Sequence, residues 1–258
     1  MFSYLMFLKN YFFIKKYSIK HGFFTRLNGL SKKEFKSLNC STSNNDEKKI
    51  VFKNRLIALK SLNLNKKKLI LIKQTHSSKV IRINENNLNK NLEADGVITS
   101  LNNVVLGILT ADCAPIFIYD DKNKFVCNLH SGWKGSLNNI SKEAIKLFDK
   151  YQIKRDNLIA IVGPCLGAKN YEVDKSFQNK FIEKNIKYSK FFQYKNKKKS
   201  YFNLRALINY QLSELGLKRI HNINQDTYSN NNFFFSHRRA THNGQKTTGR
   251  LINLISLS

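Results

Sequence analysis

Apolar residues recur every three or four positions in three segments of the chain, which is the spacing of one face of an α-helix. The predicted helices span Lys49–Leu62, Ser136–Tyr151 and Asn203–Leu215. The hydroxyl of Ser136 would cap the start of the second helix. Gly216 would end the third, because glycine readily adopts the conformation that follows many helices.

Short runs rich in β-branched and aromatic residues fill much of the remaining sequence and are typical of strands. Several of these runs follow one another with no helix between them, so the strict alternation of a doubly wound parallel sheet is absent. The pattern instead predicts an α+β fold with mixed sheets and helices packed outside them. The predicted strands are Leu69–Lys73, Lys79–Ile83, Gly96–Thr99, Val104–Thr110, Pro115–Tyr119, Phe125–Leu129, Leu158–Val162 and Phe233–Ser236.

The 258 residues suffice for one domain, and no linker rich in Pro, Gly or Ser divides them. The apolar start is interrupted by Lys9 and Asn10, and no small-residue cleavage site of a signal peptide follows it. Its uninterrupted apolar stretches are shorter than the roughly 18 residues that span a membrane. We therefore expect an N-terminal extension and first strand in residues 1–20, a single catalytic domain in residues 21–258, and no membrane span.

Composition narrows the class of protein further. The chain has 45 basic and 17 acidic residues, a net charge of +28, yet 41% of its residues are hydrophobic, which excludes a disordered chain. The lysines are scattered, so we interpret the charge as a solvated surface shaped by A/T-rich codons. A basic nucleic-acid-binding protein is the non-enzyme alternative, but the usual recognition motifs are missing and no specific nucleic acid is expected. Four cysteines without a CxxC pair favour a reducing, cytoplasmic location.

Three side chains that can bind a metal stand where predicted strands end. They are His76, Cys113 and His130. Strands of one sheet often end side by side, so these residues could converge on one ion. Two imidazoles and one thiolate suit zinc and leave a fourth position for water, the pattern of catalytic zinc sites. Copper accepts the same ligands. The spacing is no local metal motif, however, and each residue could instead have a structural role.

Several sequence blocks around these residues point to a known family. The chain resembles, from His21 to Arg250, the multicopper polyphenol oxidase (laccase)-like family, which is also described as purine nucleoside phosphorylases and includes the bacterial peptidoglycan editing factor. TADCAP together with HSGWKG is the most specific part of this likeness. The matching blocks, in order, are HGFFTRLNGLS from His21, NR at Asn54, QTHSSKV from Gln74, ADGVITS from Ala94, LTADCAPIFIYD from Leu109, LHSGWKGS from Leu129, GPCLGAKNYEV from Gly163 and FFSHRRATHNGQKTTGR from Phe234.

The resemblance implies that His76, Cys113 and His130 bind zinc, with copper possible. It implies one domain in which mixed sheets are layered between helices, in an α/β/β/α-like order. It also implies phosphorolysis of adenosine, inosine and methylthioadenosine, and deamination of adenosine. The expected partners are therefore a purine nucleoside and phosphate.

The chemistry of these reactions suggests roles for further residues. Proton transfer would need a group such as Asp112 or Asp95 near the metal, although an Asp beside a ligand often only orients it. Phosphate would need cations. The candidates, each within a matching block, are Arg26, Lys134, Arg238, Arg239 and Arg250.

The sequence departs from the family pattern in three places. Asp226-Thr227 stands where the family usually has Cys-Thr, Asn203-Leu204 where Asp-Leu is common, and His237 where Tyr is frequent. These changes put the periphery of the pocket in doubt, and leave the three metal ligands unaffected.

Two other activities compete with the nucleoside reactions. Cys113 and His130 could form a nucleophile–base pair that cleaves amides, which would suit the editing of peptidoglycan precursors. Copper-linked oxidation of polyphenols is the other alternative. It is disfavoured because the chain has six histidines and no His-x-His pair.

Overall fold

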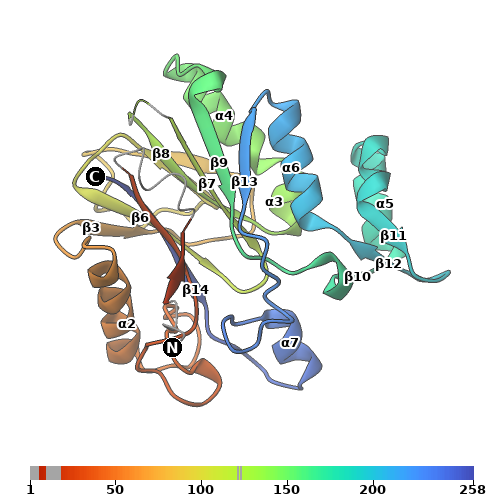
Figure 1. The fold of residues 1–258 in the computed structure, drawn as a ribbon, viewed down its shortest axis with the longest axis horizontal. Helices are drawn as coiled ribbons and strands as arrows, with labels where there is room; N and C mark the ends of the chain where they lie inside the picture. Colours follow the sequence, from red (N-terminus) through yellow and green to blue (C-terminus); the bar gives the residue numbers. More distant parts are fainter. Residues whose placement is uncertain (1–5, 10–18, 121, 123) are drawn as a thin grey trace.

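The computed structural model describes residues 6–9, 19–120, 122 and 124–258 (Figure 1). The predicted N-terminal extension lies mostly outside these described residues. The strands form two large mixed sheets and a small antiparallel one. Their bounds are β1 Phe7–Leu8, β2 Ile19–Phe24, β3 Lys68–Leu71, β4 Val80–Ile83, β5 Gly96–Thr99, β6 Val104–Thr110, β7 Ala114–Asp120, β8 Val126–Ser131, β9 Leu158–Val162, β10 Glu172–Asp174, β11 Phe192–Tyr194, β12 Lys199–Phe202, β13 Arg219–Asn222 and β14 Leu251–Leu257.

The first large sheet has the strand order β13-β9-β7-β8-β5-β4, and the second has the order β1-β2-β14-β6-β3. Pairs β13/β9, β4/β5 and β3/β6 are parallel, and the other pairs in these two sheets are antiparallel. The small sheet has the order β10-β12-β11. The helices are α2 Lys48–Ser61, α3 Trp133–Leu137, α4 Ile140–Lys150, α5 Lys175–Lys184, α6 Leu204–Glu214 and α7 His237–His242.

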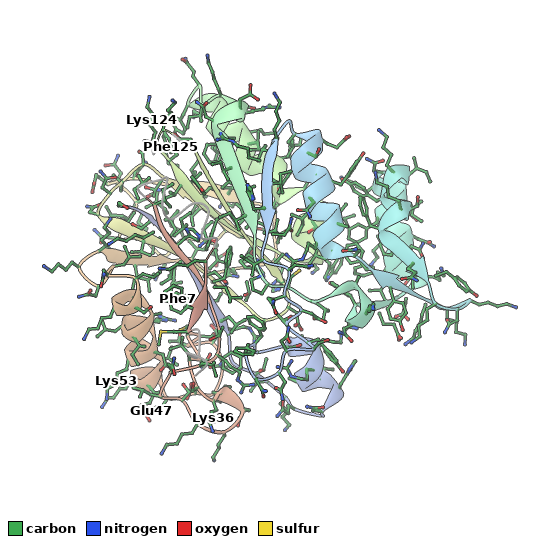
Figure 2. The ribbon with its side chains drawn as sticks, viewed as in Figure 1. Phe7, Lys36, Glu47, Lys53, Lys124 and Phe125 are labelled. Carbon is green, nitrogen blue, oxygen red and sulfur yellow. The ribbon has the colours of Figure 1, made fainter. Side chains whose placement is uncertain are left out.

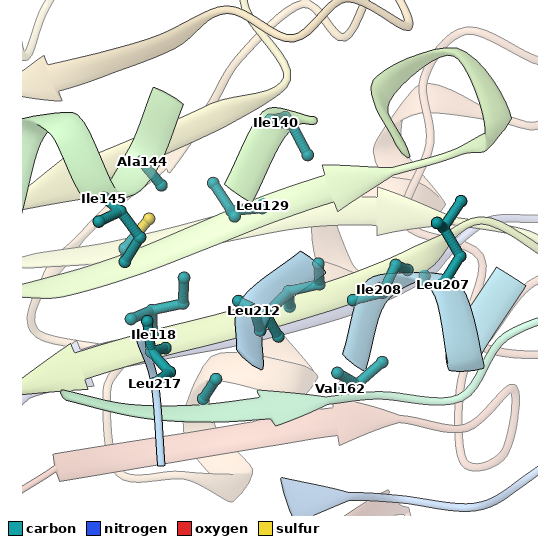
Figure 3. Close-up of a cluster of buried hydrophobic side chains, with 14 of the residues drawn as sticks. Ile118, Leu129, Ile140, Ala144, Ile145, Val162, Leu207, Ile208, Leu212 and Leu217 are labelled. Carbon is teal, nitrogen blue, oxygen red and sulfur yellow. The ribbon is translucent and has the colours of Figure 1, made fainter. Parts of the chain in front are cut away.

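The two large sheets pack face to face, and helices cover their outer faces. On the outside of the first sheet, Ile118 and Leu129 contact the helix residues Ile145 and Leu212 in one buried cluster (Figure 3). On the outside of the second sheet, α2 buries its inner side, while Lys53 points to solvent (Figure 2). The resulting order is helix, sheet, sheet, helix. This confirms the predicted single α+β domain with layered mixed sheets.

Apolar residues occupy both sides of the central strands because both sides are buried. In β7, Ile116 and Ile118 face the helices, whereas Phe117 and Tyr119 face the second sheet. Such strands appear in a sequence as continuous apolar runs without a polar alternation. This explains why their positions are easily found from the sequence.

Phe117 provides the first testable consequence of this packing. Its ring stacks on Phe23 of the opposite sheet, with centroids 4.2 Å apart and planes 17° apart. Phe117→Ala would leave a cavity between the sheets, so we expect the free energy of unfolding in urea to fall by about 3–5 kcal/mol. Phe52→Ala, at a side chain that is 57% exposed, is the matched control and should change it by less than about 0.5 kcal/mol. Equal losses for the two variants would contradict the two-sheet core.

Two predicted elements differ from the structure. Ser136 does not cap a long helix: it is buried within α3, and α4 begins separately after Asn139, whose side chain accepts a hydrogen bond from the Lys142 N–H (3.1 Å). The predicted strand Phe233–Ser236 is a turn followed by irregular chain: Phe234 and Phe235 are buried in a small cluster with Leu251 of β14, but the segment pairs with none of the described strands. The end of the third helix is confirmed, since Gly216 has a φ of 86°. None of the described helices combines the length and apolar character needed to cross a membrane.

Candidate metal centre

The three predicted metal ligands meet at one end of the sheets. His76 lies in the loop between β3 and β4, Cys113 in the turn between β6 and β7, and His130 near the end of β8. One nitrogen of each imidazole and the Cys113 sulfur all lie within 4.8 Å of one another. The two imidazole rings are 4.9 Å apart between centroids and inclined at 77°. Because β3 and β6 belong to one sheet and β7 and β8 to the other, both sheets are needed to assemble this cluster.

The cluster is buried on one side and open on the other. His130 is buried, Cys113 is half-buried and His76 is exposed. A metal ion held here would therefore be anchored from the protein interior and accessible from solvent. Sites of this kind, with three protein ligands and an open position, are typical of catalytic metals.

Asp95 holds both histidines in place. It is fully buried, and its Oδ1 lies 2.8 Å from Nδ1 of His130 and accepts the backbone N–H of His76 (3.0 Å). Its Oδ2 accepts the backbone N–H and the hydroxyl of Ser77 (2.6 and 2.7 Å). A carboxylate on Nδ1 directs Nε2 of the same ring toward a metal, and such partners commonly tune metal sites.

Charges within the cluster favour the thiolate of Cys113, which binds metal, and the protonated imidazole of His130, which must lose its proton before a metal binds. Burial alone would raise the pKa of the Cys113 thiol, but the neighbouring His130 and His76 lower it below its ordinary value. Burial likewise opposes the charged form of His130, while Cys113 and Asp95 raise the pKa of that imidazole. Burial would also raise the pKa of Asp95, yet its hydrogen bonds from His130 and Ser77 hold it well below the usual range. The sulfur is thus poised as a thiolate, the form that ligates metals.

Gly132 leaves the space that the sulfur needs. A Cβ at this position would lie 2.8 Å from Cys113 Sγ, closer than such atoms pack, and 3.6 Å from a carbon of the His76 ring. The glycine in HSGWKG therefore gives room to the metal ligands themselves. The backbone of His76 is also unusual, with a φ of 57° that directs its side chain toward the cluster.

Gly132→Ala is expected to push the Cys113 sulfur out of position while leaving the fold intact. The measurement is a metal titration of the purified variant. Its metal affinity should fall by at least about 10-fold, the lower end of the loss seen when a group that supports a metal ligand is removed. Gly135→Ala is the control, because a Cβ there would lie nearest to two backbone oxygens, at 3.3 and 3.4 Å, and not to the sulfur. Unchanged metal affinity in Gly132→Ala would contradict this account of the glycine.

Asp112 directly precedes Cys113 and contacts a different set of residues from Asp95. It is nearly buried, and its φ of 82° is rare for a residue with a side chain. Its carboxylate accepts the hydroxyl of Thr227 (2.6 Å) and the backbone N–H of Arg238 (2.6 Å). These bonds join the turn of the metal ligand to the start of α7. A role for Asp112 in proton transfer stays a prediction.

Two clefts open beside the metal ligands, and both are bordered by His76, Cys113 and His237. The aromatic cleft, of about 430 Å³, is also lined by Trp133, Tyr171 and Arg238. The polar cleft, of about 410 Å³, is also lined by Ser41, Ser43, Gln74 and Arg250. A substrate with two different ends could therefore place its reacting atoms at the metal and one end in each cleft.

Two of the five predicted phosphate-binding cations lie beside the metal ligands, and three lie elsewhere. Arg238 and Arg250 line the clefts. Arg239 donates to the carbonyls of residues 227, 228 and 234, and Arg26 lines another cavity, where it donates to the Lys36 carbonyl. Lys134 is exposed on α3 with its ammonium 5.5 Å from the Trp133 ring. Of the described residues, only the first two arginines of this set border the metal ligands.

The sequence reasoning assigned no role to three residues that border the clefts. Trp133 and Tyr171 stand within the blocks HSGWKGS and GPCLGAKNYEV, and His237 stands in the last block. Their positions within these blocks were the one feature of the sequence that could have indicated a place near the site. Trp133 packs on Phe177 with ring centroids 5.3 Å apart, and Arg238 lies 5.4 Å from the Tyr171 ring, so both aromatics have fixed positions.

Comparisons with known proteins identify the family of this chain and agree with its fold. A family model described as multi-copper polyphenol oxidoreductase laccase matches residues 20–258. A purine nucleoside phosphorylase of Haemophilus influenzae is 32% identical over 233 residues, covering 90% of this chain and 91% of the relative. One from Rickettsia prowazekii is 36% identical over 176 residues, covering 67% and 72%. The chain belongs to the multi-copper polyphenol oxidoreductase laccase family.

Solved structures show the same architecture. The hypothetical protein YfiH of Bacillus licheniformis superimposes with a TM-score of 0.86 at 25% identity, covering 93% of each chain. YlmD of Geobacillus stearothermophilus shares the fold with a TM-score of 0.87 at 21% identity, covering 98% of each chain. The layered arrangement of mixed sheets is therefore common to these proteins.

The residues present fit a metal ion by their chemistry. The cluster offers two imidazole nitrogens, one of them on a ring fixed by a buried carboxylate, and one sulfur poised as a thiolate. This set suits a borderline-soft cation such as zinc and is also acceptable to copper. The members are His76, Cys113 and His130, the three residues predicted from the sequence.

Proposed function

We propose that this chain is a zinc-dependent purine nucleoside enzyme, which cleaves adenosine, inosine and methylthioadenosine with phosphate and also deaminates adenosine. One observation carries the proposal: the cluster of His76, Cys113 and His130 borders both the aromatic cleft and the polar cleft, and each cleft contains an arginine. The names of the relatives from Haemophilus influenzae and Rickettsia prowazekii support the same reaction class.

The aromatic cleft suits the purine base. Trp133 and Tyr171 offer ring faces on which a flat base can stack, and stacking of this kind tolerates adenine and hypoxanthine alike. Arg238 adds hydrogen-bond donors at the same wall, since its Nη1 donates to the Glu172 carbonyl (2.9 Å) and, within the described part of the chain, its other side-chain N–H groups donate to no protein acceptor. The volume of about 430 Å³ accommodates a nucleoside.

The polar cleft suits phosphate. Arg250 is largely buried there, and its Nη1 donates to the carbonyls of Thr248 (2.8 Å) and Gly249 (3.2 Å). Neither partner is a carboxylate, so the positive charge is available to an anion. Burial lowers the pKa of this guanidinium, although Cys113 and Asp112 oppose that shift. An arginine in a partly dehydrated cleft binds phosphate strongly.

The two reactions place definite demands on the side chains. In phosphorolysis a phosphate oxygen bonds to C1′ as the C1′–N9 bond breaks, and the departing purine takes up a proton. In deamination water adds at C6, and the amino group takes up a proton and leaves as ammonia. A bound zinc would supply a Lewis acid. Arg250 would orient phosphate, Trp133 and Tyr171 would orient the base, and His237, which borders both clefts, would exchange the proton with the leaving base.

The test is to incubate the purified protein with adenosine, with and without phosphate, and to identify the products. Adenine and ribose 1-phosphate that appear only with phosphate would support phosphorolysis, and inosine would support deamination. Arg250→Gln should raise the KM for phosphate at least about 10-fold, whereas Arg219→Gln, on β13 away from both clefts, should not. If protein that contains metal forms neither of these products, the proposal is refuted.

A second candidate function follows from the pairing of Cys113 with His130. The lowered pKa of the thiol, which His130 and His76 cause against the effect of burial, is also what an amide-cleaving nucleophile requires. Zinc and a nucleophilic role compete for the same sulfur. Metal-free protein whose Cys113 is alkylated rapidly would favour the amide hydrolase, and about one zinc per chain would favour the nucleoside enzyme. One copper per chain together with phenol oxidation that His76→Ala abolishes would instead favour the polyphenol oxidase.

A further inference from the structure

A separate cavity of about 310 Å³ lies behind the loop that carries Leu166, and the function proposed above does not use it. Its lining residues come from the loops that follow β9 and β13 and from α6. Because β9 and β13 are parallel neighbours, both loops begin at the same end of the sheet, where the carboxyl ends of these two strands lie. Small molecules commonly bind at the carboxyl ends of parallel strands. Leu166 also borders the aromatic cleft, so it separates the two spaces.

Arg205 gives this cavity a positive charge. Its Nη1 donates to the Val162 carbonyl (3.3 Å), and its Nη2 donates to the Gln225 carbonyl (3.2 Å) and the Cys165 sulfur (3.3 Å). None of these partners is a carboxylate, and within the described part of the chain Nε has no acceptor. Since a guanidinium binds phosphate and carboxylate oxygens through several N–H groups, this arrangement favours an anionic ligand.

The acidic residue of the cavity does not cancel this charge directly. The carboxylate of Asp226 accepts hydrogen bonds from the backbone N–H groups of Gly167 (2.9 Å) and Tyr228 (2.9 Å), and from the side chains of Asn170 (2.5 Å) and Ser229 (2.8 Å). These hydrogen bonds of Asp226 join the loop that follows β9 to the loop that follows β13. These bonds fix the walls of the cavity before any ligand arrives.

Asn209, one helical turn after Arg205 on α6, favours a ligand that also donates hydrogen bonds. Asn209 donates through Nδ2 to the Asn222 side chain (3.2 Å), but its Oδ1 is buried without a partner among the described residues. A buried acceptor of this kind costs free energy until a donor reaches it. Asn203 and Asn224 add amide groups to the same lining, and Ala206 provides a small apolar floor.

We propose that this cavity is a binding site for a sugar phosphate, with the phosphate on Arg205 and a sugar hydroxyl donating to Asn209 Oδ1. Its volume is near the lower end of the range for small-molecule pockets, about 300–1,000 Å³, which suits a ligand of this size and excludes a dinucleotide. The Leu166 N–H donates to the Asp112 carbonyl (2.9 Å), so the wall of this cavity is joined directly to the turn that carries Cys113. The binding site itself stands whether or not the chain acts on nucleosides.

Calorimetric titration with ribose 5-phosphate, orthophosphate and ribose tests the proposal on the full chain. Ribose 5-phosphate should bind the wild type more tightly than either fragment. Arg205→Gln should weaken its binding at least about 10-fold, and Arg250→Gln, which removes the cation proposed to hold phosphate at the metal centre, should leave it unchanged. The reverse order of the two variants would place the ligand at the metal centre and overturn the proposal. Equal affinities for ribose 5-phosphate and orthophosphate would contradict the sugar-binding role of Asn209.

A second variant guards against misfolding of Arg205→Gln, whose guanidinium also holds main-chain carbonyls. Ala206→Glu keeps Arg205 but places a carboxylate on the floor of the cavity. It should also weaken ribose 5-phosphate binding at least 10-fold while the thermal transition stays close to that of the wild type. Unchanged binding in this folded variant would refute the site.

Discussion

Replacement of Cys113 by serine is expected to abolish metal retention and to lower kcat/KM for nucleosides by more than about 100-fold, beyond the 10–100-fold typical for a supporting partner. Cys113 is the only sulfur among the three clustered ligands. A serine hydroxyl is a far poorer ligand for zinc than a thiolate. Metal analysis after gel filtration, together with product formation from adenosine, measures both effects.

Cys127→Ala is the matched control for this experiment. Cys127 lies on β8, three residues before His130, but it faces the helices and not the metal centre. Burial raises the pKa of its thiol, so it is not poised to bind a metal. This variant should keep its metal and its activity. If Cys113→Ser also kept both, the metal centre proposed here would be wrong.

Asp95→Asn is expected to damage both the metal centre and the fold. The change keeps the size of the side chain, but its amide N–H groups would face the donors of Thr75, Ser77 or His130. Metal affinity should fall about 10–100-fold. The free energy of unfolding should fall by about 3–5 kcal/mol, as when one partner of a buried charged network is removed. Urea denaturation and metal titration measure the two losses.

The loss of stability in Asp95→Asn should also depend on pH. Burial would raise the pKa of Asp95, but the bonds from His130 and Ser77 hold it well below the ordinary value of 3.8. A depressed pKa in the folded state stabilises the fold above the unfolded pKa, and this contribution is lost as pH falls toward the folded pKa. The difference between wild type and variant should therefore be constant near neutral pH and shrink below about pH 4. Glu93→Gln, at an exposed neighbour, should show no measurable difference, and a pH-independent gap for Asp95→Asn would contradict the network.

The parts of the fold that the sequence predicted are those whose pattern is local. β7 and β9 are apolar on both sides, so they are recognisable as strands without knowledge of their partners. β14 was missed although it is the central connection of the second sheet. Its buried Asn253 and Ser256 interrupt the apolar run. Their partners, including the carbonyls of Ile108 and Val104, lie more than one hundred residues away in the sequence.

The candidate site shows the same division. His76, Cys113 and His130 were predicted as a group because each has a ligand atom and stands at a strand end, and the structure brings them together. The sequence could not rank the five cations, because which arginine borders the metal depends on contacts between distant loops. It also could not separate the roles of Asp95 and Asp112. The first supports the histidines and the second ties the turn of Cys113 to α7.

X-ray absorption spectroscopy of the purified chain, with its native metal, tests the central claim most directly. If His76, Cys113 and His130 hold one zinc ion, the spectrum will show one sulfur near about 2.3 Å and nitrogen or oxygen ligands near about 2.0–2.1 Å. The sulfur signal will be absent from Cys113→Ser protein measured with excess zinc in solution. Zinc bound without any sulfur, or a sulfur signal that survives this substitution, would contradict the account.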